Sequence, residues 1–182
     1  MEDTLRPGLL SVVLPSYNEE ASIPRAADTI TAILIDADIP HELVFVDDGS
    51  RDRTWTVIQE QAGRHPQVRG VRFSRNFGKE AAIFAGLAQA RGDCTLVMDC
   101  DLQHPPEKAV EMYRLWQEGY QVVEGVKASR GKENPLHTFA AKSFYSIISR
   151  ATGIDMSRAS DFKLLDRRAV DTLLAMREKN AF

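Results

Sequence analysis

Short apolar runs of strand length alternate along this chain with longer segments whose apolar residues recur at helical spacing. The alternation predicts an α/β domain in which helices cover a mostly parallel sheet. The first run, residues 9–14 (LLSVVL), is almost continuous, as expected of a strand buried on both faces. We predict further strands at residues 43–46, 68–73, 94–98, 121–126 and 162–165, and helices over about residues 22–34, 54–64, 79–91, 105–116, 136–151 and 168–176.

The length of 182 residues suits one compact domain. The formal net charge of −3 is evenly spread, which argues against nucleic acid as a partner. Cys94 and Cys100 cannot form a disulfide framework, so we expect a reducing, cytoplasmic setting. No signal peptide is apparent, and no apolar run reaches the roughly 20 residues needed to span a bilayer. We therefore expect the chain as given to be soluble.

Polar clusters follow four of the predicted strands, at the point where each strand ends. They are residues 15–20 (PSYNEE), 47–50 (DDGS), 74–79 (SRNFGK) and 99–104 (DCDLQH). The carboxyl ends of parallel strands meet at one edge of a sheet, where open α/β sheets bind ligands. The sequence therefore predicts a binding site at this edge.

The cluster at residues 99–104 has the clearest chemical signal, because it contains Asp99 and Asp101. Two carboxylates two residues apart at a strand end can converge on one hard cation, and Gln103 can add a neutral oxygen. Oxygen ligands favour Mg²⁺ or Mn²⁺ over Zn²⁺. The alternative is an acidic turn in which an aspartate caps the next helix.

The remaining polar residues also allow two interpretations. Asp47 and Asp48 suit either a simple turn or hydrogen bonding to a base or ribose, and Tyr17 suits either packing or stacking on a base. Lys127 and Arg130 could neutralise a diphosphate or lie in solvent. No glycine-rich phosphate motif is present, so phosphate charge would be met by a metal and basic side chains.

Taken together, three stretches resemble family 2 glycosyltransferases of the GT-A fold: residues 15–20, 46–54 (VDDGSRDRT) and 98–106 (MDCDLQHPP). Within that family, the chain looks most like the polyprenyl-phosphate glycosyltransferases, which include dolichyl-phosphate mannose synthase. Residues 74–80 and 160–167 (SDFKLLDR) favour the bacterial, bactoprenol type. The resemblance runs from about Leu10 to the end, with the motifs in the family's order.

The resemblance implies roles for individual residues. It assigns the metal, Mg²⁺ or Mn²⁺, to Asp99, Asp101 and Gln103, and it makes Asp101 and Asp161 the catalytic candidates, with Asp161 on the acceptor side. Lys163 stands where the family usually has an arginine. Donor binding is assigned to Pro15, Tyr17, Glu19, Asp48, Lys79, Asp99, Asp101, Lys127, Arg130 and Lys163.

The resemblance also implies an activity. We expect an inverting, metal-dependent transferase that moves a hexose from a nucleotide sugar, UDP-glucose first and GDP-mannose second, to a polyisoprenyl phosphate. The reaction would occur at the cytoplasmic face of the cell membrane. Residues 1–182 would be a single GT-A catalytic domain that stops before the family's juxtamembrane or transmembrane helices, and a homo-oligomer is a candidate assembly.

The sequence is also compatible with other functions. One alternative is a family 2 transferase that acts on a sugar hydroxyl in polysaccharide or cell-wall synthesis. Another is a non-catalytic nucleotide-binding domain, although such a domain would be expected to lose the paired aspartates that are present here. A dinucleotide-dependent oxidoreductase is disfavoured because the glycine fingerprint of such enzymes is missing.

Overall fold

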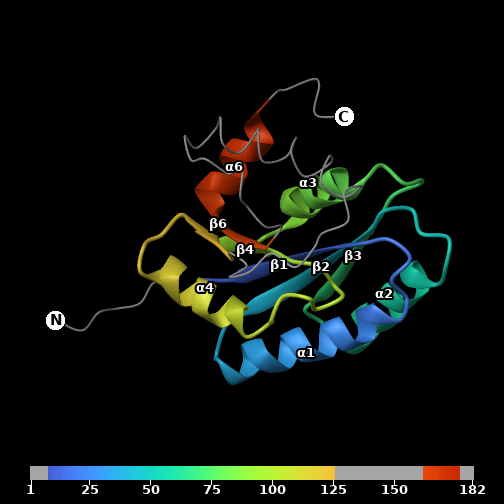
Figure 1. Ribbon diagram of the computed structural model, residues 1–182, viewed down its shortest axis with the longest axis horizontal. Coiled ribbons are helices and arrows are strands. Elements are labelled where there is room, and N and C mark those ends of the chain that lie inside the picture. The colour runs from blue at the N-terminus through green and yellow to red at the C-terminus, as the bar shows by residue number, and fades with distance from the viewer. Residues whose placement is uncertain (1–7, 126–161, 177–182) are drawn as a thin grey trace, which may run out of the picture.

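The computed structural model describes residues 8–125 and 162–176. The strands are β1 (Leu10–Ser16), β2 (His41–Asp47), β3 (Val68–Arg72), β4 (Cys94–Val97), β5 (Val122–Glu124) and β6 (Lys163–Asp166). The helices are α1 (Ser22–Asp36), α2 (Thr54–Arg64), α3 (Lys79–Gln89), α4 (Lys108–Gln117) and α6 (Arg167–Ala175). The strands form one sheet in the order β3–β2–β1–β4–β6–β5, with helices on both faces (Figure 1). The predicted α/β architecture is confirmed.

The direction of the strands places the polar clusters at one edge. Strands β1 to β4 are parallel, and in register Ser16 lies beside Asp47, which lies beside Arg72. Strand β6 runs antiparallel between β4 and β5, and its first residue, Lys163, lies beside Val97. The start of β6 therefore meets the ends of β1 to β4 at the same edge of the sheet.

The core has two layers because both faces of the sheet are covered. In β1, Leu10, Val12 and Leu14 pack on the side of α1, α2 and α4, whereas Val13 packs on the side of α3 and α6. Figure 1 shows this division of the helices. All of β1 is buried, which accounts for the continuous apolar run in the sequence.

Most of the predicted elements are confirmed, with two differences. Pro105 and Pro106 do not enter the next helix; they form a turn before α4, which begins at Lys108. Strand β5 covers three residues of the predicted 121–126. The predicted helix at 136–151 lies outside the described residues. Among the described helices, none has the length and apolarity needed to cross a membrane.

Candidate active site at the carboxyl edge of the sheet

The loops after β1 and β2 are joined by reciprocal hydrogen bonds. The backbone N–H of Asn18 donates to Ser50 Oγ at 2.9 Å, and the N–H of Arg51 donates to Asn18 Oδ1 at 2.9 Å. Asn18 has a φ of 55°, a conformation that asparagine tolerates better than most residues. The two loops therefore act as one unit, and this role of Asn18 and Ser50 was not apparent from the sequence.

A second set of bonds extends this unit to the start of α2. The N–H of Glu19 donates to Thr54 Oγ1 at 2.8 Å, and the N–H of Arg53 donates to Glu20 Oε2 at 2.8 Å. Pro15, Tyr17 and Glu19, the residues expected at the donor nucleoside, thus belong to a firmly held segment. Tyr17 remains 41% exposed, which leaves its ring accessible to a ligand.

Asp48 holds the loop that leads from β3 to α3. Its Oδ1 accepts the backbone N–H of Phe77 at 2.7 Å, and its Oδ2 accepts that of Gly78 at 2.9 Å. The residue is 3% exposed. Both carboxylate oxygens are therefore engaged within the protein, a contact that the DDGS motif alone does not reveal.

Asp47 is fully buried beside it and has a different set of partners. Its Oδ1 accepts the N–H of Ser50 at 2.9 Å, and its Oδ2 lies 3.4 Å from Arg72 Nε. The Arg72 guanidinium also lies over the Trp55 ring, 5.8 Å from its centroid. Asp47 therefore stabilises the turn after β2 and orients Arg72.

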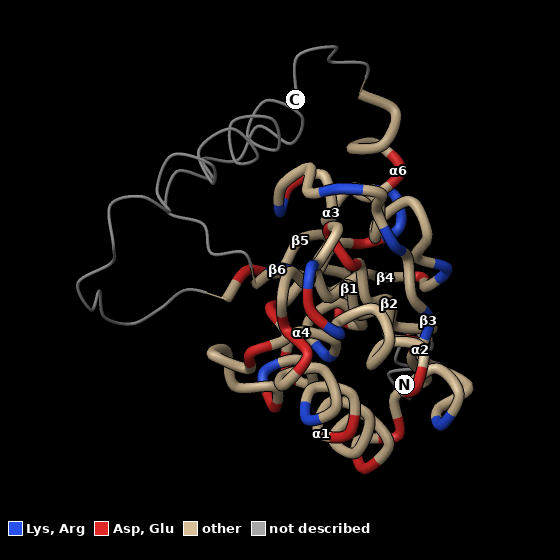
Figure 2. The backbone as a smooth tube through the Cα atoms, turned by 90° about the vertical axis from the view of Figure 1, so that its right-hand side faces the viewer, with Lys and Arg blue, Asp and Glu red and all other residues tan. Residues whose placement is uncertain are grey.

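Lys79 and Asp99 meet although they lie 20 residues apart in sequence. Lys79 is the first residue of α3, and its Nζ lies 2.7 Å from Asp99 Oδ1 at the end of β4. Both side chains are partly exposed, at 42% and 31%. Figure 2 views the molecule from this edge, where acidic and basic residues are interspersed.

Asp101 and Gln103 lie on the exposed turn that follows. The N–H of Gln103 donates to Asp101 Oδ1 at 3.0 Å, and Leu102 between them has a φ of 58°. Neither Asp101 nor Gln103 is buried. The turn therefore presents carboxylate and amide oxygens toward solvent.

These residues fit a divalent cation of the Mg²⁺ or Mn²⁺ type. Within residues 8–125 and 162–176, no group of three or more His, Cys, Asp or Glu side chains is arranged to hold a metal ion alone. Mg²⁺ is usually bound through one or two carboxylates together with substrate phosphates and water, not by a cage of protein ligands. Asp99, Asp101 and Gln103 supply oxygen donors of that kind.

Cys100, between the two aspartates, is a packing residue. Its Sγ lies 3.6 Å from the Ser16 hydroxyl under the end of β1, and burial raises the pKa of its thiol to about 12. Cys94 is also a buried free thiol. A thiol with so high a pKa is a poor nucleophile at neutral pH. The chemistry at this strand end therefore rests on the carboxylates.

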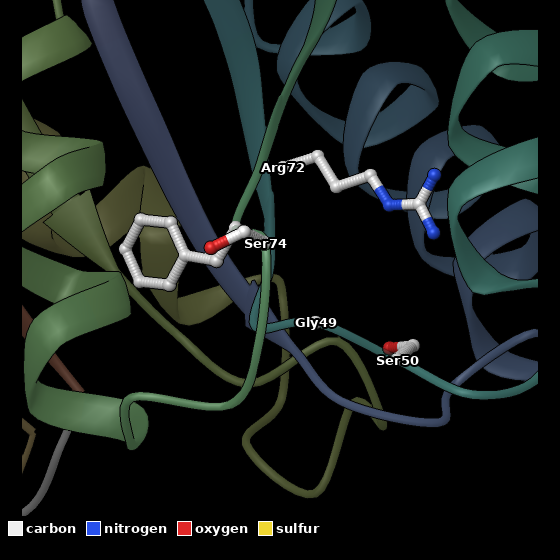
Figure 3. Close-up of a pocket in the computed structure, with 5 residues that line it drawn as sticks. Gly49, Ser50, Arg72 and Ser74 are labelled. Atoms are coloured by element: carbon white, nitrogen blue, oxygen red, sulfur yellow. The ribbon is translucent and has the colours of Figure 1, made fainter.

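A pocket of about 350 Å³ opens beside this edge, between the ends of β2 and β3. Its lining residues are Gly49, Ser50, Arg72, Phe73 and Ser74. In Figure 3, Arg72 extends on the same side of β3 as Ser50. Arg72 and Phe73 were not singled out from the sequence, because neither belongs to a recognisable motif.

The start of β6 completes the described part of the site. Lys163 is 2% exposed, and its Nζ lies 3.3 Å from Glu124 Oε1. Next to it, the Phe162 ring stacks on His104 with a centroid distance of 4.9 Å, which connects the turn after Asp101 to β6. Lys127, Arg130 and Asp161 lie outside the described residues.

Comparison with known proteins identifies the family. The family model described as "Glycosyl transferase family 2" matches residues 11–174. The chain belongs to glycosyltransferase family 2. The family resemblance of the motifs at residues 15–20, 46–54 and 98–106 is thereby confirmed.

Curated relatives are similar along nearly the whole chain. An uncharacterized glycosyltransferase of Bacillus subtilis, YkcC, is 39% identical over 94% of this chain and 54% of its own length. The undecaprenyl-phosphate 4-deoxy-4-formamido-L-arabinose transferase of Pseudomonas aeruginosa is 37% identical over 96% of this chain and 52% of its own length. The chain therefore spans about half the length of these relatives.

Solved structures confirm the GT-A fold. The mannosyl-3-phosphoglycerate synthase of Rubrobacter xylanophilus gives a TM-score of 0.65 at 20% identity, covering 88% of this chain and 54% of that one. The mannosyltransferase PcManGT of Pyrobaculum calidifontis, solved with GDP-Man and Mn²⁺, gives 0.61 at 21% identity, covering 94% and 48%. At these identities the likeness concerns the fold.

Proposed function

We propose that this family 2 chain is the catalytic part of an inverting, metal-dependent glycosyltransferase that moves a hexose from a nucleotide sugar to a polyisoprenyl phosphate. The observation that carries the proposal is a set of contacts at one edge of the sheet: Asp48 holds the amide of Gly78, the residue before Lys79, and the Lys79 ammonium lies against Asp99. The likeness to an undecaprenyl-phosphate transferase of Pseudomonas aeruginosa supports the lipid acceptor.

Each part of the edge has a role in this proposal. The joined loops after β1 and β2, with Pro15, Tyr17 and Glu19, would hold the nucleoside, and Asp48 would act indirectly, by fixing the amides of Phe77 and Gly78 beside them. Asp99, Asp101 and Gln103 would hold the cation, which supplies positive charge to the donor diphosphate when bound. Lys79 would face the same diphosphate, as would Lys127 and Arg130, whereas Lys163, buried beside Glu124, would support the site without contacting the donor.

The lipid acceptor simplifies the chemistry that the protein must supply. A monophosphate is mostly dianionic at neutral pH, since its second pKa lies near 6. One of its oxygens can form the bond to the anomeric carbon from the face opposite the leaving group. The bond from that carbon to the diphosphate breaks, and its electron pair leaves with the nucleoside diphosphate. No general base is then required, and Asp161 would orient the acceptor.

The donor and the location also belong to this proposal. UDP-glucose is the first candidate donor and GDP-mannose the second. Solved structures of the same fold hold either one with Mn²⁺: PcManGT holds GDP-Man, and glucosyl-3-phosphoglycerate synthase of Mycobacterium tuberculosis holds UDP-glucose. Capture of the lipid would occur at the cytoplasmic membrane face.

A thermal-shift panel tests the donor half of the proposal. UDP, GDP, UDP-glucose and GDP-mannose are each added with and without Mn²⁺, and stabilisation should follow RT ln(1 + [L]/Kd) for the matching base. Asp101→Ala should remove the manganese-dependent part and leave the fold intact, because Asp101 is exposed. Asp36→Ala, an exposed change at the end of α1, is the control. Lack of stabilisation by any nucleotide, or metal dependence that survives in Asp101→Ala, would contradict the proposal.

A further inference from the structure

The two aspartates expected to hold the cation have different partners in the ligand-free protein. The Asp99 carboxylate lies against the Lys79 ammonium, with 2.7 Å between Oδ1 and Nζ. The Asp101 carboxylate accepts only a backbone N–H, that of Gln103, among the contacts described for it, and it is exposed. A cation approaching this edge would therefore find Asp101 accessible and Asp99 already neutralised by a positive charge.

Lys79 is held in this place by the nucleoside side of the site. Asp48 binds the amides of Phe77 and Gly78, the two residues that precede Lys79. Gly78 has a φ of 99° and directs the chain into α3. Since the polypeptide is fixed up to the residue before Lys79, the backbone places Lys79 at this edge, and the ion pair with Asp99 places its ammonium.

The position of Lys79 is electrostatically unfavourable for the helix itself. A positive charge in the first turn opposes the helix dipole, which prefers anions at that end. The Asp99 carboxylate offsets this cost in the ligand-free protein. A diphosphate would also offset it, because it brings negative charge to the amino end of α3.

We propose that Lys79 couples donor binding to metal binding: its ammonium occupies Asp99 in the ligand-free protein, and the donor diphosphate takes over the ammonium and releases Asp99 to the cation. The inference rests on the proposed function. It makes the metal bind weakly before the donor and more tightly with it. Because coupling between two ligands is reciprocal, the metal raises the affinity for the donor by the same factor.

Removing the charge of Lys79 should have opposite effects on the two metal-binding states. In Lys79→Met, no ammonium competes with the cation for Asp99. Mn²⁺ alone should therefore bind about fivefold tighter, as expected for loss of a partly exposed ion pair and of a nearby like charge. With nucleoside diphosphate present, Mn²⁺ affinity should not rise. The ratio of Mn²⁺ affinities with and without nucleotide should therefore fall about fivefold or more. Lys79→Arg should keep most of the coupling.

Titration of the free-Mn²⁺ EPR signal measures these affinities without turnover. It is performed on the whole chain with and without UDP and GDP. The matched control is Lys108→Met, which removes a 2.7 Å ion pair with Glu111 on the exposed face of α4 and should change nothing. A purely structural role for Lys79 would weaken Mn²⁺ binding in both states.

The results separate this inference from the proposed function. If the wild type binds nucleotide and Mn²⁺ but Lys79→Met binds Mn²⁺ alone no more tightly, the coupling role of Lys79 is wrong and the proposed function stands. If the wild type binds neither ligand, both are wrong. Tighter binding of Mn²⁺ alone with a reduced nucleotide effect supports the coupling.

Discussion

Gly49 lies so close to Arg75 that a Cβ atom on Gly49 would be 2.3 Å from the Arg75 carbonyl carbon. Gly49 also has a φ of +67°, where a side chain is strained. The loops after β2 and β3 thus pack backbone against backbone. The glycine of the DDGS motif is explained by this contact.

Gly49→Ala should therefore destabilise the protein. The left-handed conformation costs about 1–2 kcal/mol for a residue with a Cβ, and displacing the Arg75 backbone adds about 1–3 kcal/mol. Urea unfolding measures the loss in the free energy of unfolding relative to the wild type. Gly63→Ala is the matched control, since nothing lies within 4 Å of a Cβ there and the position is in α2; it should gain up to about 1 kcal/mol. Equal effects of the two substitutions would contradict the packing described.

Asp48→Asn tests the clamp on the β3–α3 loop. An amide can accept only one of the two N–H groups that Asp48 now accepts, and its own NH₂ group would face the other. An unmatched buried donor costs about 1–3 kcal/mol, so we expect that loss in urea unfolding. Amide hydrogen exchange at Phe77 and Gly78 should accelerate. Unchanged exchange at both amides would show that Asp48 does not hold them; Asp36→Asn is the exposed control.

The high pKa of Cys100 makes stability depend on pH. Burial raises the pKa of this thiol from its usual 9.0 to about 12, so its neutral form is favoured in the folded protein. The contribution of the neutral Cys100 thiol to the free energy of unfolding is complete below pH 9, where the unfolded thiol is also neutral. It is lost as the pH rises from 9 toward 12. Between pH 8 and 10 the wild type should lose about 1 kcal/mol more than Cys100→Ala.

Urea unfolding at several pH values provides the measurement. The wild type is compared with Cys100→Ala because Tyr113 also contributes to the pH dependence. Burial also raises the pKa of Tyr113, so the wild type has a second group with the same sign of pH dependence. Tyr113 is present in both proteins, and the difference between them isolates Cys100. Parallel pH profiles for the two proteins would mean that the Cys100 thiol is not shielded from solvent.

Asp161→Asn distinguishes a phosphate acceptor from a hydroxyl acceptor. Loss of a general base costs about 10²- to 10⁴-fold in rate, whereas a dianionic lipid phosphate needs none. In a preparation that turns over polyprenyl phosphate, we expect less than about 100-fold loss of kcat. The acidic limb of the pH–rate profile should still report ionisation of the acceptor phosphate near pH 6. Loss of several orders of magnitude with both substrates bound would favour the sugar-hydroxyl alternative.

The sequence predicted the strands well where burial alone decides them. Residues 9–14 read as a strand buried on both faces, and β1 lies in the middle of the sheet. The direction and position of β6 were not predictable, because an apolar run records burial and not the neighbour with which a strand pairs. That β6 runs antiparallel between β4 and β5 follows only from the assembled sheet.

The candidate site shows the same division. The four polar strand ends were identified as parts of one site, since parallel strands bring them to a common edge. The contacts that these residues make were not predicted, because contacts depend on distances between loops. Lys79 meets Asp99 across 20 residues, and Asp48 reaches amides about 30 residues away. The resemblance named these residues, and only the structure shows what they touch.

The place of β6 in the sheet has a consequence for synthesis on the ribosome. Residues up to Glu124 can be complete while the growing polypeptide still lacks Lys163–Asp166, the strand that pairs with both β4 and β5. Until then, the backbone edge of β4 is open to other strands, as exposed edges are in aggregating proteins. A nascent chain halted near residue 125 should therefore be a better substrate for chaperones than one released after α6 has formed.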